Sequence, residues 1–151
     1  MPLWLDLGYQ ISPEIMLGAY GQYGFPFVGR CMAGATCTLN NLRFGIQGQY
    51  HFRPDRGLDP WLGLSFGYEL MWGSAERTGD GSFVAEYGGW EYANLHAGAA
   101  MPLASGFRAG PFGSVSVAEY STRTQDGATV EIDSTALHHW LLVGLEGAFA
   151  F

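Results

Sequence analysis

Charged, amide and imidazole side chains recur at every second position along several apolar segments of this chain. Such groups on one side of a strand could form a buried hydrogen-bonded network or a narrow polar path for protons or small solutes. We favour the network, because an unpaired buried charge costs several kcal/mol and these groups must therefore pair. The predicted network comprises Asp6, Arg43, Gln47, Gln49, His51, Arg53, Glu69, Asn94, His96, Arg108 and Glu146.

A second set of polar residues could support catalysis near the end of the chain. His138 and His139 precede the last apolar segment, and Glu119, Ser121 and Ser134 lie upstream of them. A nucleophile, a base and a carboxylate of these types catalyse acyl transfer when they are adjacent. No family-specific spacing ties them together, so the sequence predicts no catalytic residues. It also predicts no metal site and no cofactor.

The two cysteines, Cys31 and Cys37, are close in the sequence. Their spacing suits a small covalent ring, and an oxidising compartment favours its formation. We predict a disulfide that holds the first long loop, with free thiols as the alternative.

The composition indicates one apolar domain and an unusual surface. The chain has 151 residues, of which 48% are hydrophobic and only 14% are charged, against about 25% charged in soluble domains. All seven basic residues are arginines, and the formal net charge is −7. Nucleic-acid binding is therefore not expected, since no basic stripe exists to neutralise phosphates. A soluble surface would also need more charge than this.

The elements that position these residues are predicted to be β-strands. Apolar residues alternate with small or polar ones, which is typical of strands with two different faces. The pattern covers seven segments, at residues 3–11, 15–27, 42–53, 62–72, 91–101, 108–117 and 141–151. Glu91 falls on the apolar face of the fifth, which predicts a β-bulge or a strand end there. No segment is long and apolar enough for a membrane-spanning helix.

Alternation alone does not determine which face points inward. A soluble lipocalin-like barrel turns its apolar face inward, and a membrane barrel turns it outward. Here the polar face consists of Gly, Ser, Gln and isolated charges, which suits a crowded lumen, and the apolar face carries almost no charge. We therefore predict an all-β, antiparallel up-and-down transmembrane β-barrel in which residues 1–151 form one domain. A lipocalin-like carrier is the alternative.

The last segment, from Trp140 to Phe151, resembles the C-terminal assembly signal of Gram-negative outer-membrane barrels, with Phe149 and Phe151 in one phase. Segments 3–27 and 59–68 also resemble the small outer-membrane β-barrel proteins, of the OmpX- and OmpW-like size class. This resemblance implies an integral outer-membrane protein with a periplasmic C-terminus. Its implied partners are membrane lipid, lipopolysaccharide and, through the last strand, the barrel-assembly machinery. It implies little about activity.

Loop lengths predict the orientation of the strands. The short connections are 12–14, 53–59 and 103–106, and the longer, polar ones are 30–41, 73–82 and 122–136. Long loops of outer-membrane barrels are external, so the last strand would run towards the periplasm and the first strand would start at the outer side. Bacterial barrels have even strand numbers. We therefore expect an eighth strand and a signal peptide upstream of Met1 in the native precursor. A separate strand at 84–88, or a seven-stranded barrel, is the alternative.

Aromatic residues are expected to form girdles at both membrane interfaces. The predicted outer girdle is Tyr23, Phe25, Phe27, Trp72, Trp90 and Tyr120. The predicted periplasmic girdle is Tyr9, Tyr50, Phe52, Trp61, Phe149 and Phe151.

These patterns favour a non-enzymatic barrel with a structural or surface-interaction role, in which the external loops carry recognition. The first alternative is a narrow transport barrel or channel for small apolar solutes or ions, with a weak place in its wall near Pro111 and Gly113. The second alternative is a lipid A-modifying enzyme.

Overall fold

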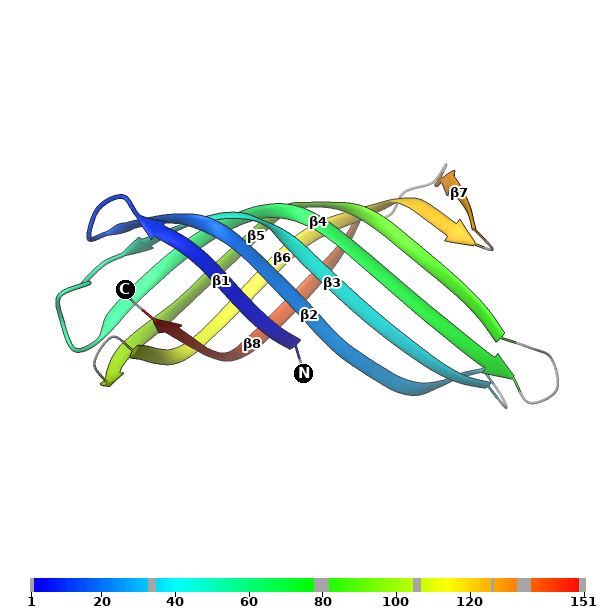
Figure 1. Cartoon of the computed structure of the whole chain (residues 1–151), viewed down its shortest axis with the longest axis horizontal. Helices are drawn as coiled ribbons and strands as arrows, with labels where there is room; N and C mark the ends of the chain where they lie inside the picture. Colours follow the sequence, from blue (N-terminus) through cyan, green and yellow to red (C-terminus); the bar gives the residue numbers. More distant parts are fainter. Residues whose placement is uncertain are drawn as a thin grey trace.

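The computed structural model describes residues 2–32, 35–77, 82–104, 107–125, 127–132 and 137–149. Within these ranges, side chains are described for residues 3–24, 37–74, 84–104, 107–125, 127–132 and 137–147. The described chain is all-β and contains no helix. Its strands form one antiparallel sheet that curls around a central lumen (Figure 1).

Seven long strands make the wall of the curled sheet, and one short strand lies beyond it. The strands are β1 (Pro2–Gln10), β2 (Ile15–Met32), β3 (Ala35–His51), β4 (Asp59–Arg77), β5 (Ser82–Ala104), β6 (Phe107–Gln125), β7 (Ala128–Glu131) and β8 (Leu137–Phe149). The predicted antiparallel all-β fold and its seven amphipathic segments are confirmed. The alternative of a separate strand at 84–88 is wrong, because these residues belong to β5.

Consecutive strands are neighbours from β1 to β6, and β8 pairs with β6. The short strand β7 pairs with the last residues of β6, just beyond the part of β6 that pairs with β8. Residues 11–14 and 52–58 connect strands at one end of the sheet, which we call the turn end. The opposite end carries β7 and the adjoining ends of β2 and β3 and of β4 and β5, and we call it the hairpin end (Figure 1).

The predicted long loops are wrong in extent. In the described residues, β2 and β3 continue through most of the predicted loop 30–41, and β4 continues to Arg77. Thr38, in the middle of that predicted loop, pairs with Val28 on one side and with Ser74 on the other. β-Branched residues favour strands, and a continued ladder satisfies backbone groups that a loop would leave to water. The hairpins therefore extend the sheet instead of ending it.

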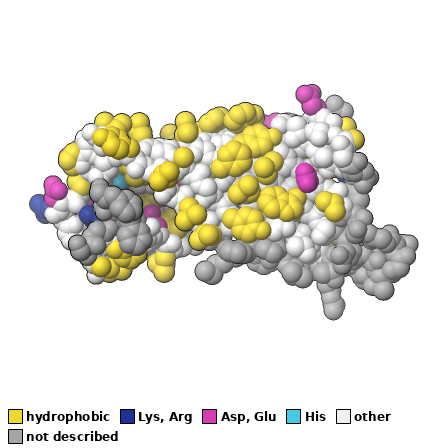
Figure 2. All heavy atoms as spheres, in the orientation of Figure 1, with side chains coloured by type: hydrophobic (Ala, Val, Ile, Leu, Met, Phe, Trp, Pro, Cys, Tyr) yellow, Lys and Arg dark blue, Asp and Glu magenta, His cyan; other side chains and the backbone are white. Residues whose placement is uncertain are grey.

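Side chains on the two faces of the sheet differ sharply in exposure. From Trp61 to Leu70 in β4, every odd-numbered residue is buried and every even-numbered one is exposed or half-buried. Leu62, Leu64 and Phe66 are among the exposed residues, whereas Ser65 and Glu69 are buried. Figure 2 shows hydrophobic side chains spread over much of the face in view, with most of the charged ones towards the ends. The apolar face points outward, so the lipocalin-like orientation is wrong.

Glycines on the inner face make room for the close approach of neighbouring strands. A Cβ atom built at Gly45 would lie 2.1 Å from the carbonyl oxygen of Phe66 and 2.5 Å from the Cα of Gly67. These are backbone atoms of a paired strand, which cannot rotate away. By contrast, a Cβ atom built at Gly21 would have no other atom within 4 Å.

We expect Gly45→Ala to lower the free energy of unfolding by about 1–3 kcal/mol, because the new methyl group would overpack two backbones. Gly21→Ala is the matched control, with an expected change within about 0.5 kcal/mol. Urea titration of both variants in detergent micelles measures the difference. Equal stabilities would show that the strands can separate at Gly45 without loss.

Candidate functional site

The centre of the lumen holds a buried ion pair between β3 and β5. Arg43 is 1% exposed and Glu91 is 0% exposed. The Nε of Arg43 donates to a carboxylate oxygen of Glu91 at 2.6 Å. Its two terminal nitrogens donate to the side-chain oxygen of Gln22 at 3.0 Å and to the hydroxyl of Ser116 at 2.5 Å. One guanidinium thus connects four strands, β2, β3, β5 and β6.

Glu91 reaches the lumen because β5 is irregular at this point. The β4–β5 register shifts between Ser65 and Gly67, and the β5–β6 register shifts between Glu91 and Ala93. The extra residue lets Glu91 and Asn94 both face inward, although regular alternation would separate them. The predicted β-bulge near Glu91 is confirmed.

A second buried carboxylate, Glu69 on β4, accepts hydrogen bonds from four side chains. The donors are the amide of Asn41 at 2.5 Å, the hydroxyl of Tyr120 at 2.5 Å, the indole nitrogen of Trp140 at 3.0 Å and Nε2 of His138 at 3.1 Å. The imidazole of His138 also stacks on the Tyr120 ring, with centroids 4.3 Å apart. Glu69 is fully buried.

Contacts across the lumen join strands that are not neighbours in the sheet. Glu69 on β4 binds His138 and Trp140 on β8. Nearer the turn end, the indole nitrogen of Trp61 on β4 donates to Glu146 on β8 at 2.5 Å. Because β8 pairs only with β6 among the described strands, these bonds hold the sheet in its curled form.

Aromatic rings fill the lumen on the turn-end side of the ion pair. Trp61, Ala100 and Phe112 form a buried cluster, with Trp4 and Leu142 packed against it. The Trp4 ring lies 5.7 Å from that of Phe112, centroid to centroid. These rings and the ion pair both lie in the lumen.

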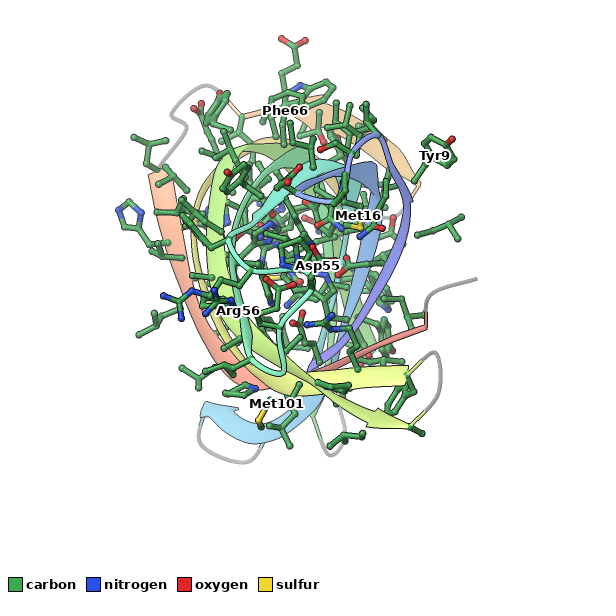
Figure 3. The ribbon with its side chains drawn as sticks, turned by 90° about the vertical axis from the view of Figure 1, so that its left-hand side faces the viewer. Tyr9, Met16, Asp55, Arg56, Phe66 and Met101 are labelled. Carbon is green, nitrogen blue, oxygen red and sulfur yellow. The ribbon has the colours of Figure 1, made fainter. Side chains whose placement is uncertain are left out.

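The turn 52–58 crosses the turn end and is tied down by one acidic residue. The buried carboxylate of Asp59 contacts Nδ1 of His51 at 2.8 Å and accepts from the backbone nitrogen of Arg53 at 3.1 Å. Arg108 forms an ion pair with Asp59 at 3.5 Å and donates to the carbonyl of Pro54 at 2.9 Å. In Figure 3, which looks at this end, Asp55 of the turn lies over the middle of the molecule.

Most of the predicted network faces the lumen. Six of its members are buried: Arg43, Gln47, Gln49, Glu69, Asn94 and His96. His51, Arg108 and Glu146 are half-buried at or near the turn end. Asp6 belongs to the inner face, where it accepts from the indole of Trp4 at 2.5 Å, yet it is exposed at the edge of the sheet. Arg53 is a correction: β3 ends at His51, so Arg53 lies exposed in the turn.

Several lumen residues are not members of the predicted network, although Tyr20, Gln22 and Ser116 fall on the polar face of the strand pattern. They are Tyr20, Gln22, Asp59, Glu91, Ser116, Tyr120, His138 and Trp140. Tyr120 and Trp61 had been predicted to lie in the interfacial girdles, but both point inward and donate to carboxylates. Their polar ring atoms were the available signal, since a buried Tyr or Trp needs a hydrogen-bond partner.

Some buried polar atoms have no hydrogen-bond partner among the described residues. They include both amide atoms of Gln47, both of Asn94, and both ring nitrogens of His96. Ordered water commonly satisfies buried groups of this kind. This part of the lumen has the chemistry to bind water or a small polar molecule.

The structure does not assemble the possible catalytic residues into one site. His138 points into the lumen and binds Glu69, whereas its neighbour His139 is exposed. The carboxylate of Glu119 accepts from the hydroxyl of Tyr92, an exposed residue, at 2.9 Å. Ser134 lies outside the described residues. None of the described serines is hydrogen-bonded to His138 or His139.

Further predicted features lie wholly or partly outside the described residues, among them the side chains of Phe25 and Phe27 of the predicted outer girdle. Cys37 is half-buried, but the side chain of Cys31 is not described, so the disulfide stays a prediction. Phe149 ends β8 opposite Phe107, its side chain is not described, and Phe151 lies outside the described residues.

We expect the Cys31–Cys37 disulfide to block alkylation of the purified protein until a reductant is added. Intact mass after iodoacetamide treatment, with and without prior reduction, measures this. A Cys37→Ser variant should be alkylated at Cys31 without reductant. Full alkylation of the unreduced native chain would show free thiols instead.

Comparison with protein-family models, curated proteins and solved structures finds no match to this chain. Among the described residues, no helix is long and apolar enough to span a membrane. The same residues contain no group of three or more His, Cys, Asp or Glu side chains arranged to hold a metal ion.

Proposed function

We propose that this protein is an integral β-barrel of the outer membrane with a structural or surface-interaction role. In this proposal the C-terminus is periplasmic, the hairpin end faces outward, and the protein is not an enzyme. Membrane lipid and lipopolysaccharide surround the wall. The barrel-assembly machinery recognises the last strand, β8.

The observation that carries the proposal is the reversed distribution of polarity across the wall. Large apolar residues such as Ile46, Leu64 and Leu95 are exposed, while Arg43 and Glu91 are buried. Water would make this arrangement unfavourable on both faces, whereas a bilayer favours it. In β4 the outward apolar residues extend from Leu62 to Leu70, and a strand crosses a bilayer with about 9–11 residues.

The test is an arginine placed on the outer face. In a membrane, Leu64→Arg should lower the free energy of unfolding by about 2–4 kcal/mol near the bilayer centre. In a water-soluble protein an exposed leucine tolerates the same change within about 0.5 kcal/mol. Urea titration of the protein folded in phospholipid vesicles measures the change, and Thr129→Arg on exposed β7 is the control. Equal stability of both variants would contradict a membrane location.

The filled lumen supports a structural role over transport. Arg43 and its partners, and then Trp4, Trp61 and Phe112, occupy successive levels of the lumen. We expect no conductance steps in planar bilayers, because these side chains occupy the lumen. Regular steps that vanish on boiling the sample would instead support the transport alternative.

The hairpin end is the part suited to recognition. Glu76 of β4 and Glu131 of β7 are acidic, and Asp80 follows β4 in the sequence. The described strands at this end project beyond the apolar part of the wall (Figure 1). Expression of the protein should leave lipid A unchanged in mass, since none of the described serines is hydrogen-bonded to His138 or His139. A mass shift of lipid A would favour the enzyme alternative.

A further inference from the structure

A pocket at the turn end lies between the two turns of that end, and we call it the turn-end pocket. It has a volume of about 400 Å³, which is in the range of small-molecule sites. Figure 3 looks onto this end and shows Asp55 over the middle of the molecule, with Arg56 to its left. The lining residues are Glu14 of the turn 11–14 and Phe52, Arg53, Pro54, Asp55 and Arg56 of the turn 52–58.

Hydrogen bonds hold both walls of the turn-end pocket in place. The backbone nitrogen of His51 donates to the carbonyl of Glu14 at 2.7 Å, so the two turns are joined to each other. Within the longer turn, the backbone nitrogen of Arg56 donates to the carbonyl of Arg53 at 3.1 Å. The carboxylate of Asp59 holds the start of the same turn through the backbone nitrogen of Arg53. A pocket whose walls are already ordered loses little conformational entropy when it binds a ligand.

The charged side chains of the pocket are balanced in sign and available to a ligand. Arg53 and Arg56 are exposed, and within the described part of the chain neither guanidinium forms an ion pair. Asp55 is also exposed, and its carboxylate is unpaired within the same residues. One carboxylate oxygen of Glu14 accepts from the hydroxyl of Ser12 at 3.0 Å, which leaves the other for a ligand. Two cations and two anions around one pocket favour a ligand that carries both signs of charge.

The turn-end pocket adjoins the apolar outer face of the sheet. Phe52 lines the pocket and is 56% exposed. Its ring meets that of Tyr50 edge-on, with centroids 5.1 Å apart. Tyr50 and its β2 partner Ile15 are exposed large hydrophobic residues. A ligand with its charged group in the pocket can therefore lay a hydrocarbon chain against these side chains, which a small water-soluble zwitterion would leave uncovered.

We propose that the turn-end pocket binds the headgroup of a zwitterionic phospholipid of the phosphatidylethanolamine kind. The guanidinium groups of Arg53 and Arg56 donate to the phosphate, because a planar guanidinium matches the spacing of phosphate oxygens. The carboxylates of Glu14 and Asp55 accept from the ammonium group. The acyl chains lie along the outer face beside Phe52. The inference rests on the proposed membrane location and names a lipid partner for the turn end.

Native mass spectrometry of the full chain in detergent micelles counts the bound lipid. The probes are phosphatidylethanolamine and phosphatidylglycerol with the same acyl chains, and O-phosphoethanolamine as the headgroup alone. We expect at least about fivefold more retained phosphatidylethanolamine than phosphatidylglycerol, because the latter offers no ammonium to the two carboxylates and each exposed ion pair contributes modestly. Equal retention of the two lipids would overturn the inference. Equal binding of O-phosphoethanolamine and the lipid would also overturn it, since the pocket would then recognise a soluble zwitterion.

Charge variants assign the preference to the four side chains. Arg53→Gln with Arg56→Gln should lower the retained phosphatidylethanolamine at least about fivefold, whereas Arg123→Gln, near the hairpin end, should leave it unchanged. Glu14→Gln with Asp55→Asn should reverse the preference towards phosphatidylglycerol, because two uncompensated cations then attract an anionic lipid. These side chains are exposed or half-buried, so the circular-dichroism spectrum and the urea midpoint of each variant should match those of the native chain. Unchanged lipid retention by either double variant would overturn the inference.

Flotation with phosphatidylcholine vesicles separates this inference from the proposed function. A chain that stays in the aqueous phase would contradict the membrane location, on which both proposals rest. A chain that floats with the vesicles, yet retains phosphatidylethanolamine and phosphatidylglycerol equally, would overturn only the headgroup site.

Discussion

Replacing Arg43 with methionine should lower the free energy of unfolding by about 3–5 kcal/mol. The guanidinium makes hydrogen bonds to Glu91, Gln22 and Ser116, and neither it nor the Glu91 carboxylate is accessible to water. Methionine has a similar length but leaves the Glu91 charge buried without its cation. That unpaired charge, more than the lost contacts, is the cause of the expected loss.

A double variant separates the buried charge from the packing. Arg43→Met with Glu91→Gln should recover a large part of the stability, because no buried charge then remains unpaired. Arg56→Met, in the exposed turn 52–58, is the control, with an expected change within about 0.5 kcal/mol. Urea titration in detergent micelles measures all three. If the double variant is no more stable than Arg43→Met alone, the ion pair does not account for the loss.

Replacing Glu69 with alanine should destabilise the protein by at least about 3 kcal/mol. Asn41, Tyr120, His138 and Trp140 would each lose the acceptor that they share. The first three are half-buried and Trp140 is exposed, so each loss should lie towards the lower end of the about 1–3 kcal/mol that an unpaired buried donor costs. The effects are not additive, so the lower part of the summed range is expected. β8 should be the strand most affected, since two of the four donors belong to it.

Trp140 reports this change directly. Loss of its bond to Glu69 should shift its fluorescence to longer wavelength, as the indole at the edge strand becomes more solvated. Trp140→Phe identifies its share of the signal, and Glu86→Ala, an exposed residue on β5, is the matched control. An unchanged spectrum with lower stability would mean that β8 stays docked through Trp61 and Glu146.

Period-two alternation was enough to predict the strands and most of the lumen residues. A strand places alternate side chains on opposite faces whatever its neighbours are, so Gln47, Gln49 and His96 could be assigned from local sequence alone. The irregularity at Glu91 could also be predicted from the local sequence, because this acidic residue falls at a position of the apolar face in the alternating pattern. Arg53 shows the limit of this reasoning, since a pattern does not indicate where a strand stops.

The partners of these residues depended on the tertiary structure. Glu69 meets His138 and Trp140 because the curl of the sheet brings β4 opposite β8, and no local pattern encodes the register and curvature that do so. The strands of the hairpins are longer than predicted for the same reason. A paired neighbouring strand satisfies the backbone N–H and C=O groups of residues that would otherwise form a loop. By itself, the sequence determined which way each side chain faces, because that is a property of a single strand. Only the folded sheet decided what each side chain meets, because that depends on strands far apart in the chain.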